Sequence, residues 1–340
     1  MKKAKFKKKQ LILIGVNALL IIGVIICLLL YNSTASTLVA QDAAKRWTGE
    51  SELRYTQVSC FIDRAVAPNL DTLQAFSSKV DEALVAASLE APSEGSLWTY
   101  AYSSETTLDI TGDYGKAEAT VLGVSGDFFL FHPLVLRTGS YISDDDFMDD
   151  RVVIDEELAW KTFGSIDIVG MSVTINNIPY QIAGVISRED DKFSNKSYQG
   201  GSRLYMSYSA LAKIVTDPLI TCYEIVLPDP ISQFGIGVVK ENFLKDEEGK
   251  NTVEIVENTG RFAVEPITNV LLHFNERTIQ ESSIAYPYWE NAARLVENQL
   301  AWLLFFTFIF SLFPLACLIY LIVKEIKHVK HYLKKFKKSV

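Results

Sequence analysis

Cysteine and histidine are scarce in this chain of 340 residues, which contains four of each. No cysteine pair has the CxxC spacing of a structural zinc site. No histidine lies in an HExxH metalloprotease motif, and the sequence lacks both a GxSxG nucleophile elbow and a GxxxxGK[ST] phosphate loop. These absences argue against a hydrolase and mean that the chain is not itself an ATPase. We therefore expect a protein that is not an enzyme and that needs no cofactor or metal.

An aspartate block is the one feature that suggests cation binding. Calcium loops of the EF-hand type alternate their ligands, carry a glycine at the sixth position and end on a glutamate. The block supplies none of these features, so we interpret it as a solvated acidic loop, with weak cation binding as the alternative. Its members are Asp144, Asp145, Asp146, Asp149 and Asp150.

Charge is distributed unevenly along the chain. Residues 1–31 and 324–340 each carry a net charge of +6, and the whole chain carries −8, so the middle carries −20. An acidic middle argues against nucleic-acid binding, which requires a basic face.

Two long runs contain no charged residue: Leu11 to Tyr31, with 21 residues, and Leu300 to Val323, with 24. A helix needs about 20 apolar residues to cross a bilayer. The flanking lysines place both termini in the cytoplasm by the positive-inside rule and residues 32–299 outside the cell membrane. The first run exceeds the usual signal-peptide length, so we favour an uncleaved anchor over a cleaved signal.

Hydrophobic periodicity predicts an α+β domain between the two runs. A strand within 51–63, a helix from Asn69 and a strand near 97–110 form one unit, and 221–258 repeats the order strand, helix, strand. We predict a split ferredoxin-like (porter-type) domain over about 51–115 and 209–286, interrupted by a β-rich subdomain over about 116–208. Helical stalks are expected at 36–50 and 287–299, and a tight hairpin at Asn176 and Asn177.

The stretch Gly123 to Asp146 is predicted to form a structural corner rather than a catalytic loop. Ser125 is a candidate cap for a short helical turn, and Gly139 permits a tight turn. Phe128, Phe129 and Phe131 offer a large apolar surface that must be buried.

Several segments in this order resemble the extracytoplasmic core domain of the MacB family of ABC transporter permeases, which includes FtsX-like permeases. They are VLGVSGDFF at 121–129, LVLRTGSYIS at 134–143, VVIDEELAWKTFG at 152–164 and VGMSVTINNIPYQIAGVI at 169–186. The motif residues, to which the resemblance gives structural roles, are Gly123, Asp127, Phe128, Phe129, Gly139, Ala159, Phe163, Gly164, Gly170, Gly184 and Val185.

The resemblance implies a permease-like protein that works as a dimer with a cytoplasmic ABC ATPase. In that family, ATP-driven movement of the membrane helices is passed to the outside domain, which is called mechanotransmission. Family permeases carry three further membrane helices after the domain, whereas this sequence has one, so we expect a form shortened to two membrane helices. Its expected partners are an ATPase, a permease or an adaptor protein.

The C-terminal segment 324–338 has the pattern of a basic amphipathic helix. We expect it to lie on the anionic inner leaflet, with a contact to an ATPase and a frayed tail as alternatives. Its apolar face would consist of Ile326, Val329, Leu333 and Phe336, and its basic face would include Lys327, Lys330 and Lys334.

Cys60 and Cys222 both fall outside the membrane, where a disulfide could persist. The alternation of apolar residues places them on different sides of the sheet, which counts against the bond.

The sequence thus predicts a non-catalytic subunit of an ABC-type export or mechanotransmission assembly. An autonomous ligand-binding or sensor module is the alternative.

Overall fold

The computed structural model describes residues 8–49, 51–89, 95–142, 146, 148–198, 201–244, 252–274 and 283–336, with side chains up to residue 331. The chain divides into two compact units. The first comprises Met1–Thr37, Phe262–Thr278 and Leu295–Val340, and the second comprises Leu38–Arg261 and Ile279–Arg294.

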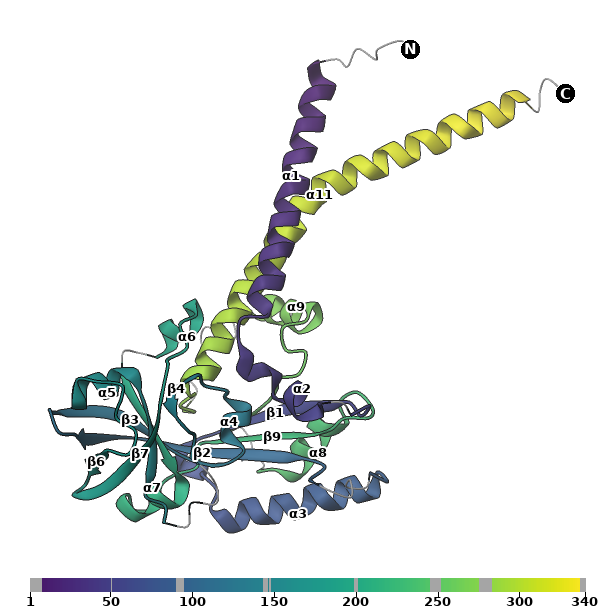
Figure 1. The fold of residues 1–340 in the computed structure, drawn as a ribbon. Coiled ribbons are helices and arrows are strands. Elements are labelled where there is room, and N and C mark those ends of the chain that lie inside the picture. Colours follow the sequence, from purple (N-terminus) through teal and green to yellow (C-terminus); the bar gives the residue numbers. More distant parts are fainter. Residues whose placement is uncertain are drawn as a thin grey trace. The chain divides into compact units, whose positions relative to one another are not determined.

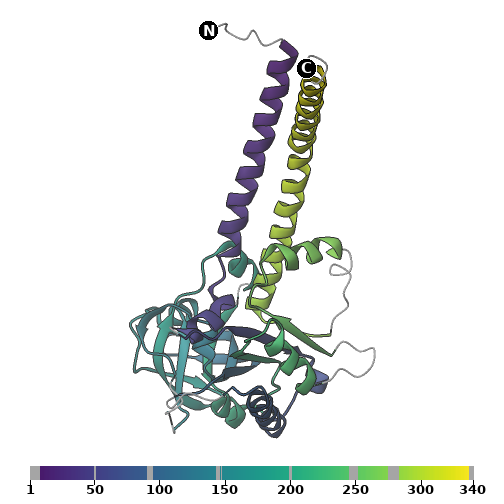
Figure 2. The same ribbon diagram turned by 90° about the vertical axis from the view of Figure 1, so that its right-hand side faces the viewer.

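The first unit is helical. It contains α1 (Lys8–Ala35), α9 (Val264–Leu272) and most of α11 (Tyr288–Phe336). The spans Lys8–Ala35 and Tyr288–His331 are long and apolar enough to cross a membrane. Gly23 of α1 faces the ring of Phe310 of α11 so closely that an added Cβ would lie 3.0 Å from it. Figure 2 shows α1 in purple and α11 in yellow-green.

Four strands of the second unit have the predicted ferredoxin-like order. They are β1 (Tyr55–Ile62), β2 (Thr99–Thr111), β9 (Cys222–Pro228) and β10 (Val253–Glu257), arranged as β10-β1-β9-β2 with all neighbours antiparallel. The crossovers β1-α3-β2 and β9-α8-β10 supply two helices, α3 (Leu70–Ala86) and α8 (Phe234–Asn242). The α+β prediction is confirmed, and so is the Asn69 cap, whose Oδ1 accepts a hydrogen bond from the Thr72 amide at 2.9 Å.

The segment between β2 and β9 extends the same sheet. β3 pairs with β2 along its whole length, and the sheet continues β3-β8-β5-β7-β4, with β6 pairing β2 and β7. Figure 1 labels β3, β4, β6 and β7 of this part. Asn176 and Asn177 have φ values of 49° and 67°, as a tight β6-β7 hairpin requires, so that prediction is also confirmed. The elements are β3 (Lys116–Gly126), α4 (Phe128–Phe131), β4 (Leu136–Gly139), β5 (Arg151–Asp155), α5 (Glu156–Phe163), β6 (Ser172–Ile175), β7 (Ile178–Ile186), α6 (Lys192–Ser197), β8 (Ser202–Ser207) and α7 (Tyr208–Ile214).

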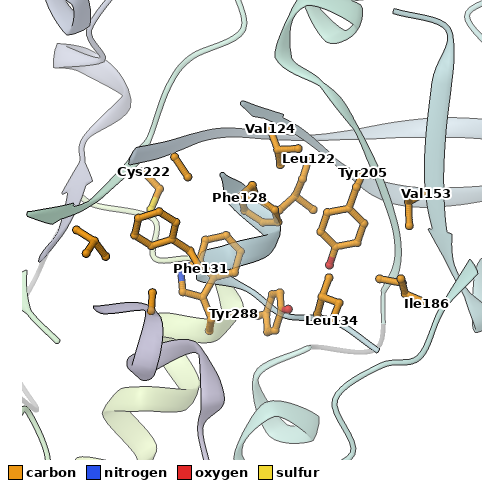
Figure 3. Close-up of a cluster of buried hydrophobic side chains, with 14 of the residues drawn as sticks. Leu122, Val124, Phe128, Phe131, Leu134, Val153, Ile186, Tyr205, Cys222 and Tyr288 are labelled. Atoms are coloured by element: carbon orange, nitrogen blue, oxygen red, sulfur yellow. The ribbon is translucent and has the colours of Figure 1, made fainter. Parts of the chain in front are cut away.

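Three groups of buried side chains hold this unit together. The α3 core lies between α3, α8 and one face of the ferredoxin-like strands and includes Phe76, Val80 and Val239. The α5 core surrounds Leu158 and Phe163. The α11 core covers the opposite face and contains Trp289. Figure 3 shows Phe128, Phe131, Tyr205 and Tyr288 of this core.

Cys60 and Cys222 belong to different cores. In the β1-β9 register Cys60 lies opposite Tyr223 and Cys222 opposite Phe61. Cys60 therefore points into the α3 core and Cys222 into the α11 core. Both thiols are free, and burial raises the pKa of each. The disulfide considered from the sequence does not form, because the two side chains leave opposite faces of the sheet.

Two local predictions differ from the structure. The segment 36–50 is not one helical stalk: α1 ends at Ala35, and η1 (Val39–Asp42) and α2 (Ala43–Thr48) follow as short separate helices. Ala43 is fully buried in the α11 core, so tertiary packing rather than helical periodicity sets the conformation of this segment. Ser125 does not cap α4, because it lies within β3.

Candidate functional site at the foot of helix α11

The first residues of α11, Tyr288, Trp289 and Glu290, form a buried junction between this helix and the sheet face. Their exposed fractions are 3%, 5% and 1%. Successive residues of a helix point about 100° apart. These three side chains therefore contact three different parts of the second unit. We call them the foot of α11.

Glu290 forms a buried ion pair with Arg261, which follows β10. The Arg261 guanidinium donates from Nη1 at 2.7 Å and from Nη2 at 2.8 Å to the two carboxylate oxygens. Arg294, one turn further along α11, donates from Nε to Glu290 at 2.7 Å and from Nη2 to Glu254 of β10 at 2.6 Å. Its guanidinium also lies 4.0 Å from the ring centre of Tyr286. Two arginines thus join the start of α11 to the edge of the sheet.

The ion pair continues inward through a chain of hydrogen bonds. Arg261 donates to the Asn258 side chain at 3.3 Å, and Asn258 donates to the Ser59 hydroxyl at 2.6 Å. Ser59 of β1 donates in turn to Glu224 of β9 at 2.8 Å, and the other oxygen of Glu224 pairs with the imidazole of His132. Since unpaired polar groups are costly inside a protein, such a connected network favours one arrangement of its members.

Trp289 packs against the corner that follows β3. Its ring centre lies 4.3 Å from that of His132 and 5.9 Å from that of Phe128. The Trp289 Nε1 group is buried and has no hydrogen-bond partner among the described residues. Phe128 and His132 of this corner therefore contact the first turn of α11. Phe128 also belongs to the α11 core.

Tyr288 contacts a different part of the second unit, formed by Tyr198 after α6 and Arg203 of β8. Its ring stacks on that of Tyr198 at 4.3 Å between centres, with 21° between the planes. The Arg203 guanidinium of β8 lies 4.2 Å from the Tyr288 centre and 4.4 Å from the Tyr198 centre. Burial raises the pKa of the Tyr288 hydroxyl well above its usual range, so the ring stays neutral beside the cation. Cation–π contacts of this kind stabilise by about 2 kcal/mol when they are desolvated.

Arg203 is also held through its backbone. Its amide donates to Asp155 Oδ2 at 2.9 Å, and Arg188 donates to the same oxygen at 2.8 Å. Burial raises the pKa of Asp155, and the charge of Arg188 opposes that rise.

The charged and aromatic groups of the foot contact one another and residues of the sheet. Among the described residues, no three His, Cys, Asp or Glu side chains are grouped so as to hold a metal ion. The ionisable side chains at the foot are engaged with one another rather than exposed in a cleft. This arrangement packs the first turn of α11 against residues from both halves of the sheet.

The motif glycines lie elsewhere and have packing roles. A Cβ on Gly139 (φ 77°) would lie 2.1 Å from the Ala183 carbonyl oxygen, and one on Gly184 would lie 2.4 Å from the Ser140 carbonyl oxygen, so β4 and β7 approach closely only because both are glycine. Gly164 ends α5 in the left-handed conformation, and Gly170 has a φ of 86°. A Cβ on Gly123 would meet Leu211 at 2.6 Å.

The remaining motif residues fall into two of the cores. Ala159, Phe163 and Val185 are buried in the α5 core. Phe128 is buried in the α11 core, Phe129 stacks on Tyr141 at 4.4 Å, and Asp127 accepts a hydrogen bond from the Thr99 hydroxyl. Of the motif residues, the structure brings Phe128 to the foot, where its ring meets that of Trp289, and leaves Phe163 and the glycines apart.

Other sequence-predicted residues are only partly described. Asp144 and Asp145 lie outside the described residues, as do the side chains of Leu333, Lys334 and Phe336. The backbone is helical as far as Phe336, and Ile326, Lys327, Val329 and Lys330 are exposed on it.

The sequence did not single out Tyr288, Glu290, Arg261 or Arg203. The only signal for the foot was the apolar stripe of the expected stalk, which includes Trp289 and Ala293.

Comparison with known proteins identifies the family. The model of the MacB-like periplasmic core domain matches residues 18–233, which is more than half of the chain. The chain belongs to this family. Its core domain is therefore the extracytoplasmic type found in ABC-transporter permeases, and the two apolar helices at its ends fit a membrane protein that carries such a domain outside.

A curated relative shares a shorter region. The macrolide export ATP-binding/permease protein MacB of Chromobacterium violaceum is 33% identical over 96 residues, which is 28% of this chain and 14% of the relative. The aligned region thus spans about one seventh of that relative's length.

Solved structures are similar at low identity. The periplasmic region of MacB from Actinobacillus actinomycetemcomitans matches with a TM-score of 0.44 and 16% identity, covering 64% of this chain and 92% of that one. The extracellular domain of the noncanonic ABC-type transporter YknZ from Gram-positive bacteria matches with a TM-score of 0.39 and 16% identity, covering 59% and 99%. A domain of a putative permease from Porphyromonas gingivalis matches with a TM-score of 0.35 and 15% identity, covering 65% and 91%.

Proposed function

We propose that this protein is a non-catalytic membrane subunit of an ABC-type export or mechanotransmission assembly. The single observation that carries the proposal is the continuity of α11, one helix of 49 residues from Tyr288 to Phe336. One end of this helix is the buried foot, and its middle is the apolar span. Movement of the membrane part would reach the sheet without passing through a loop.

The buried foot supports this role over that of a simple anchor. A tether requires only a linker, whereas here Arg261, Arg203 and Trp289 fix the helix to the sheet from three directions. Because interiors are close-packed, a displacement of the first turn must move the groups packed against it.

The proposed partners are inferred from the family to which the chain belongs and from the positive charge of its two ends. We propose an ABC ATPase on the cytoplasmic side, together with a permease or an adaptor protein, and a dimer as the working form. Both lysine-rich ends would lie in the cytoplasm. The segment 324–338 would rest on the anionic leaflet, with Lys327 and Lys330 facing the headgroups.

A stiffness test distinguishes transmission from anchoring. Four glycines inserted after Asn298 would make α11 flexible between the foot and the apolar span, whereas four alanines add the same length and keep the helix. Hydrogen–deuterium exchange of the outside domain would be compared with and without ATP, in membranes that also contain the co-purifying ATPase.

The proposal predicts an ATP-dependent change for wild type and for the alanine insertion, and its loss for the glycine insertion. An equal response in both insertions would contradict transmission through α11. Full absence of a co-purifying ATPase would favour the alternative, an autonomous ligand-binding or sensor module.

A further inference from the structure

A cavity of about 550 Å³ lies on the second unit, where the end of β3 meets α4 and α7. A second cavity of about 430 Å³ adjoins it and shares Leu70 and Tyr208 with it. Both are distinct from the foot of α11. We call the two cavities together the acidic groove.

Aromatic rings form the apolar part of the groove. Tyr102 and Tyr208 meet edge to face at 5.3 Å between centres, and Phe128 and Phe129 line the same cavity. The Tyr208 hydroxyl donates to the Pro218 carbonyl at 2.8 Å, so its polar end is already bonded. Rings held in this way suit apolar side chains of a ligand.

Carboxylates line each of the two cavities. Asp146 and Asp149 line the larger one, and Asp71 and Asp217 line the smaller. In the described part of the chain, neither lining includes a lysine, an arginine or a histidine. The groove as a whole is therefore apolar and negatively charged.

The two carboxylates of the larger cavity differ in their hydrogen-bond partners. Asp149 accepts hydrogen bonds from the hydroxyls of Ser207 and Ser209, at 2.9 and 2.6 Å, and pairs with the half-exposed Lys213 at 3.1 Å. Asp146 Oδ2 is buried and has no hydrogen-bond partner among the described residues. A buried oxygen of this kind gains free energy when a donor arrives.

We propose that the acidic groove binds a short basic peptide segment of a partner protein, in which apolar residues are flanked by lysine or arginine. Two joined cavities, each with its own carboxylates, match a chain with separated positive charges better than a compact ligand with a single charge. The aromatic rings would take the apolar side chains, and Asp149 and Asp146 would take one cation.

The test uses the purified full chain in a neutral detergent and two dye-labelled peptides. The probe is Lys-Phe-Leu-Lys-amide, and the matched control is Glu-Phe-Leu-Glu-amide, each with the dye on its N-terminal amine and with binding followed by fluorescence anisotropy. We expect binding of the lysine peptide only, weakened as salt screens the charges. Asp149→Asn should weaken it about fivefold, since a half-exposed ion pair contributes up to about 1 kcal/mol.

A steric variant keeps the proposal testable if Asp149→Asn alters folding. Ala212 is exposed on α7 and lines the larger cavity, so Ala212→Trp should fill the cavity and weaken binding at least about tenfold. Ala86→Trp, at an exposed position of α3 outside both linings, should leave binding unchanged. Equal binding of the two peptides, or equal effects of the two tryptophan variants, would overturn the proposal. No ATPase is needed, so this outcome is independent of the proposed transmission.

Discussion

The guanidinium of Arg261 donates two hydrogen bonds to the carboxylate of Glu290, although 29 residues separate them in the chain. The exposed fractions of the two residues are 5% and 1%. Arg261 closes the turn after the edge strand β10, and Glu290 lies in the first turn of the helix that continues into the apolar span. This pair therefore joins the last strand of the sheet to α11.

Breaking this pair on one side should destabilise the outside domain strongly. Arg261→Met leaves the Glu290 charge buried with less compensation, for which we expect a loss of about 3 to 5 kcal/mol. The double variant Arg261→Met with Glu290→Leu should recover part of the loss, because both charges are then removed. Guanidinium unfolding in detergent measures both variants.

An exposed ion pair provides the matched control. Lys116 and Asp109 pair at 2.8 Å with 58% of each side chain exposed, so Lys116→Ala should change stability by less than about 1 kcal/mol. Similar losses for Arg261→Met and Lys116→Ala would show that the foot is not held by its buried charges.

Alanine substitutions at two glycines with positive φ, Gly164 and Gly139, distinguish the cost of backbone strain from the cost of a steric clash. Gly164 (φ 68°) has nothing within 4 Å of an added Cβ, so Gly164→Ala should cost about 1 to 2 kcal/mol, from strain alone. Gly139→Ala places its methyl group against the Ala183 carbonyl and should cost at least about 3 kcal/mol. Unfolding midpoints of the two variants measure these losses of stability. Equal losses for both variants would contradict the close approach of β4 and β7.

The Tyr288 ring should matter more than its hydroxyl. Tyr288→Ala removes the stack with Tyr198 and the contact with Arg203 and should cost about 3 to 5 kcal/mol, whereas Tyr288→Phe retains the ring and should cost about 1 kcal/mol. Tyr114→Ala, at a residue that is 84% exposed, is the control, with an expected change within about 0.5 kcal/mol. A loss for Tyr288→Phe as large as that for Tyr288→Ala would contradict the role of the stack.

The stability of the folded chain should depend on pH through Asp149, which lines the acidic groove. Burial tends to raise the pKa of this carboxyl, but hydrogen bonds from Ser209, Ser207 and Lys213 outweigh it and hold the pKa below its ordinary value of 3.8. The carboxylate therefore contributes stability that is fully present above pH 3.8 and is lost as the pH falls through the lower folded-state value. Unfolding of wild type and Asp149→Asn at several pH values should show a stability difference that is constant near neutrality and shrinks in acid. A difference that grows in acid would contradict this sign.

Much of the outside domain was predictable from the sequence because its signals are local. The helical spacing of Leu73, Phe76 and Val80, the Asn69 cap and the Asn176-Asn177 turn each depend on residues close together in the chain. The two strand-helix-strand units predicted a split ferredoxin-like domain, and the structure arranges its four strands as β10-β1-β9-β2.

The foot was not predictable, because its groups come from distant segments. Glu290 in a helix next to polar residues is typical of a solvated surface, and only the folded chain brings Arg261 and Arg294 to it. Arg203 lies in β8, a strand that the sequence did not indicate, and its aromatic partners are Tyr198, directly after α6, and Tyr288 of α11. Likewise, the periodicity of residues 36–50 suits a helix, but burial of Ala43 favours two short helices instead.

The most direct test of the central claim is affinity purification of the full-length chain from its native membrane in mild detergent, with identification of the proteins that accompany it. The account predicts an ABC ATPase together with a permease or an adaptor in stoichiometric amounts. Recovery of the chain alone, or only with further copies of itself, would contradict the account.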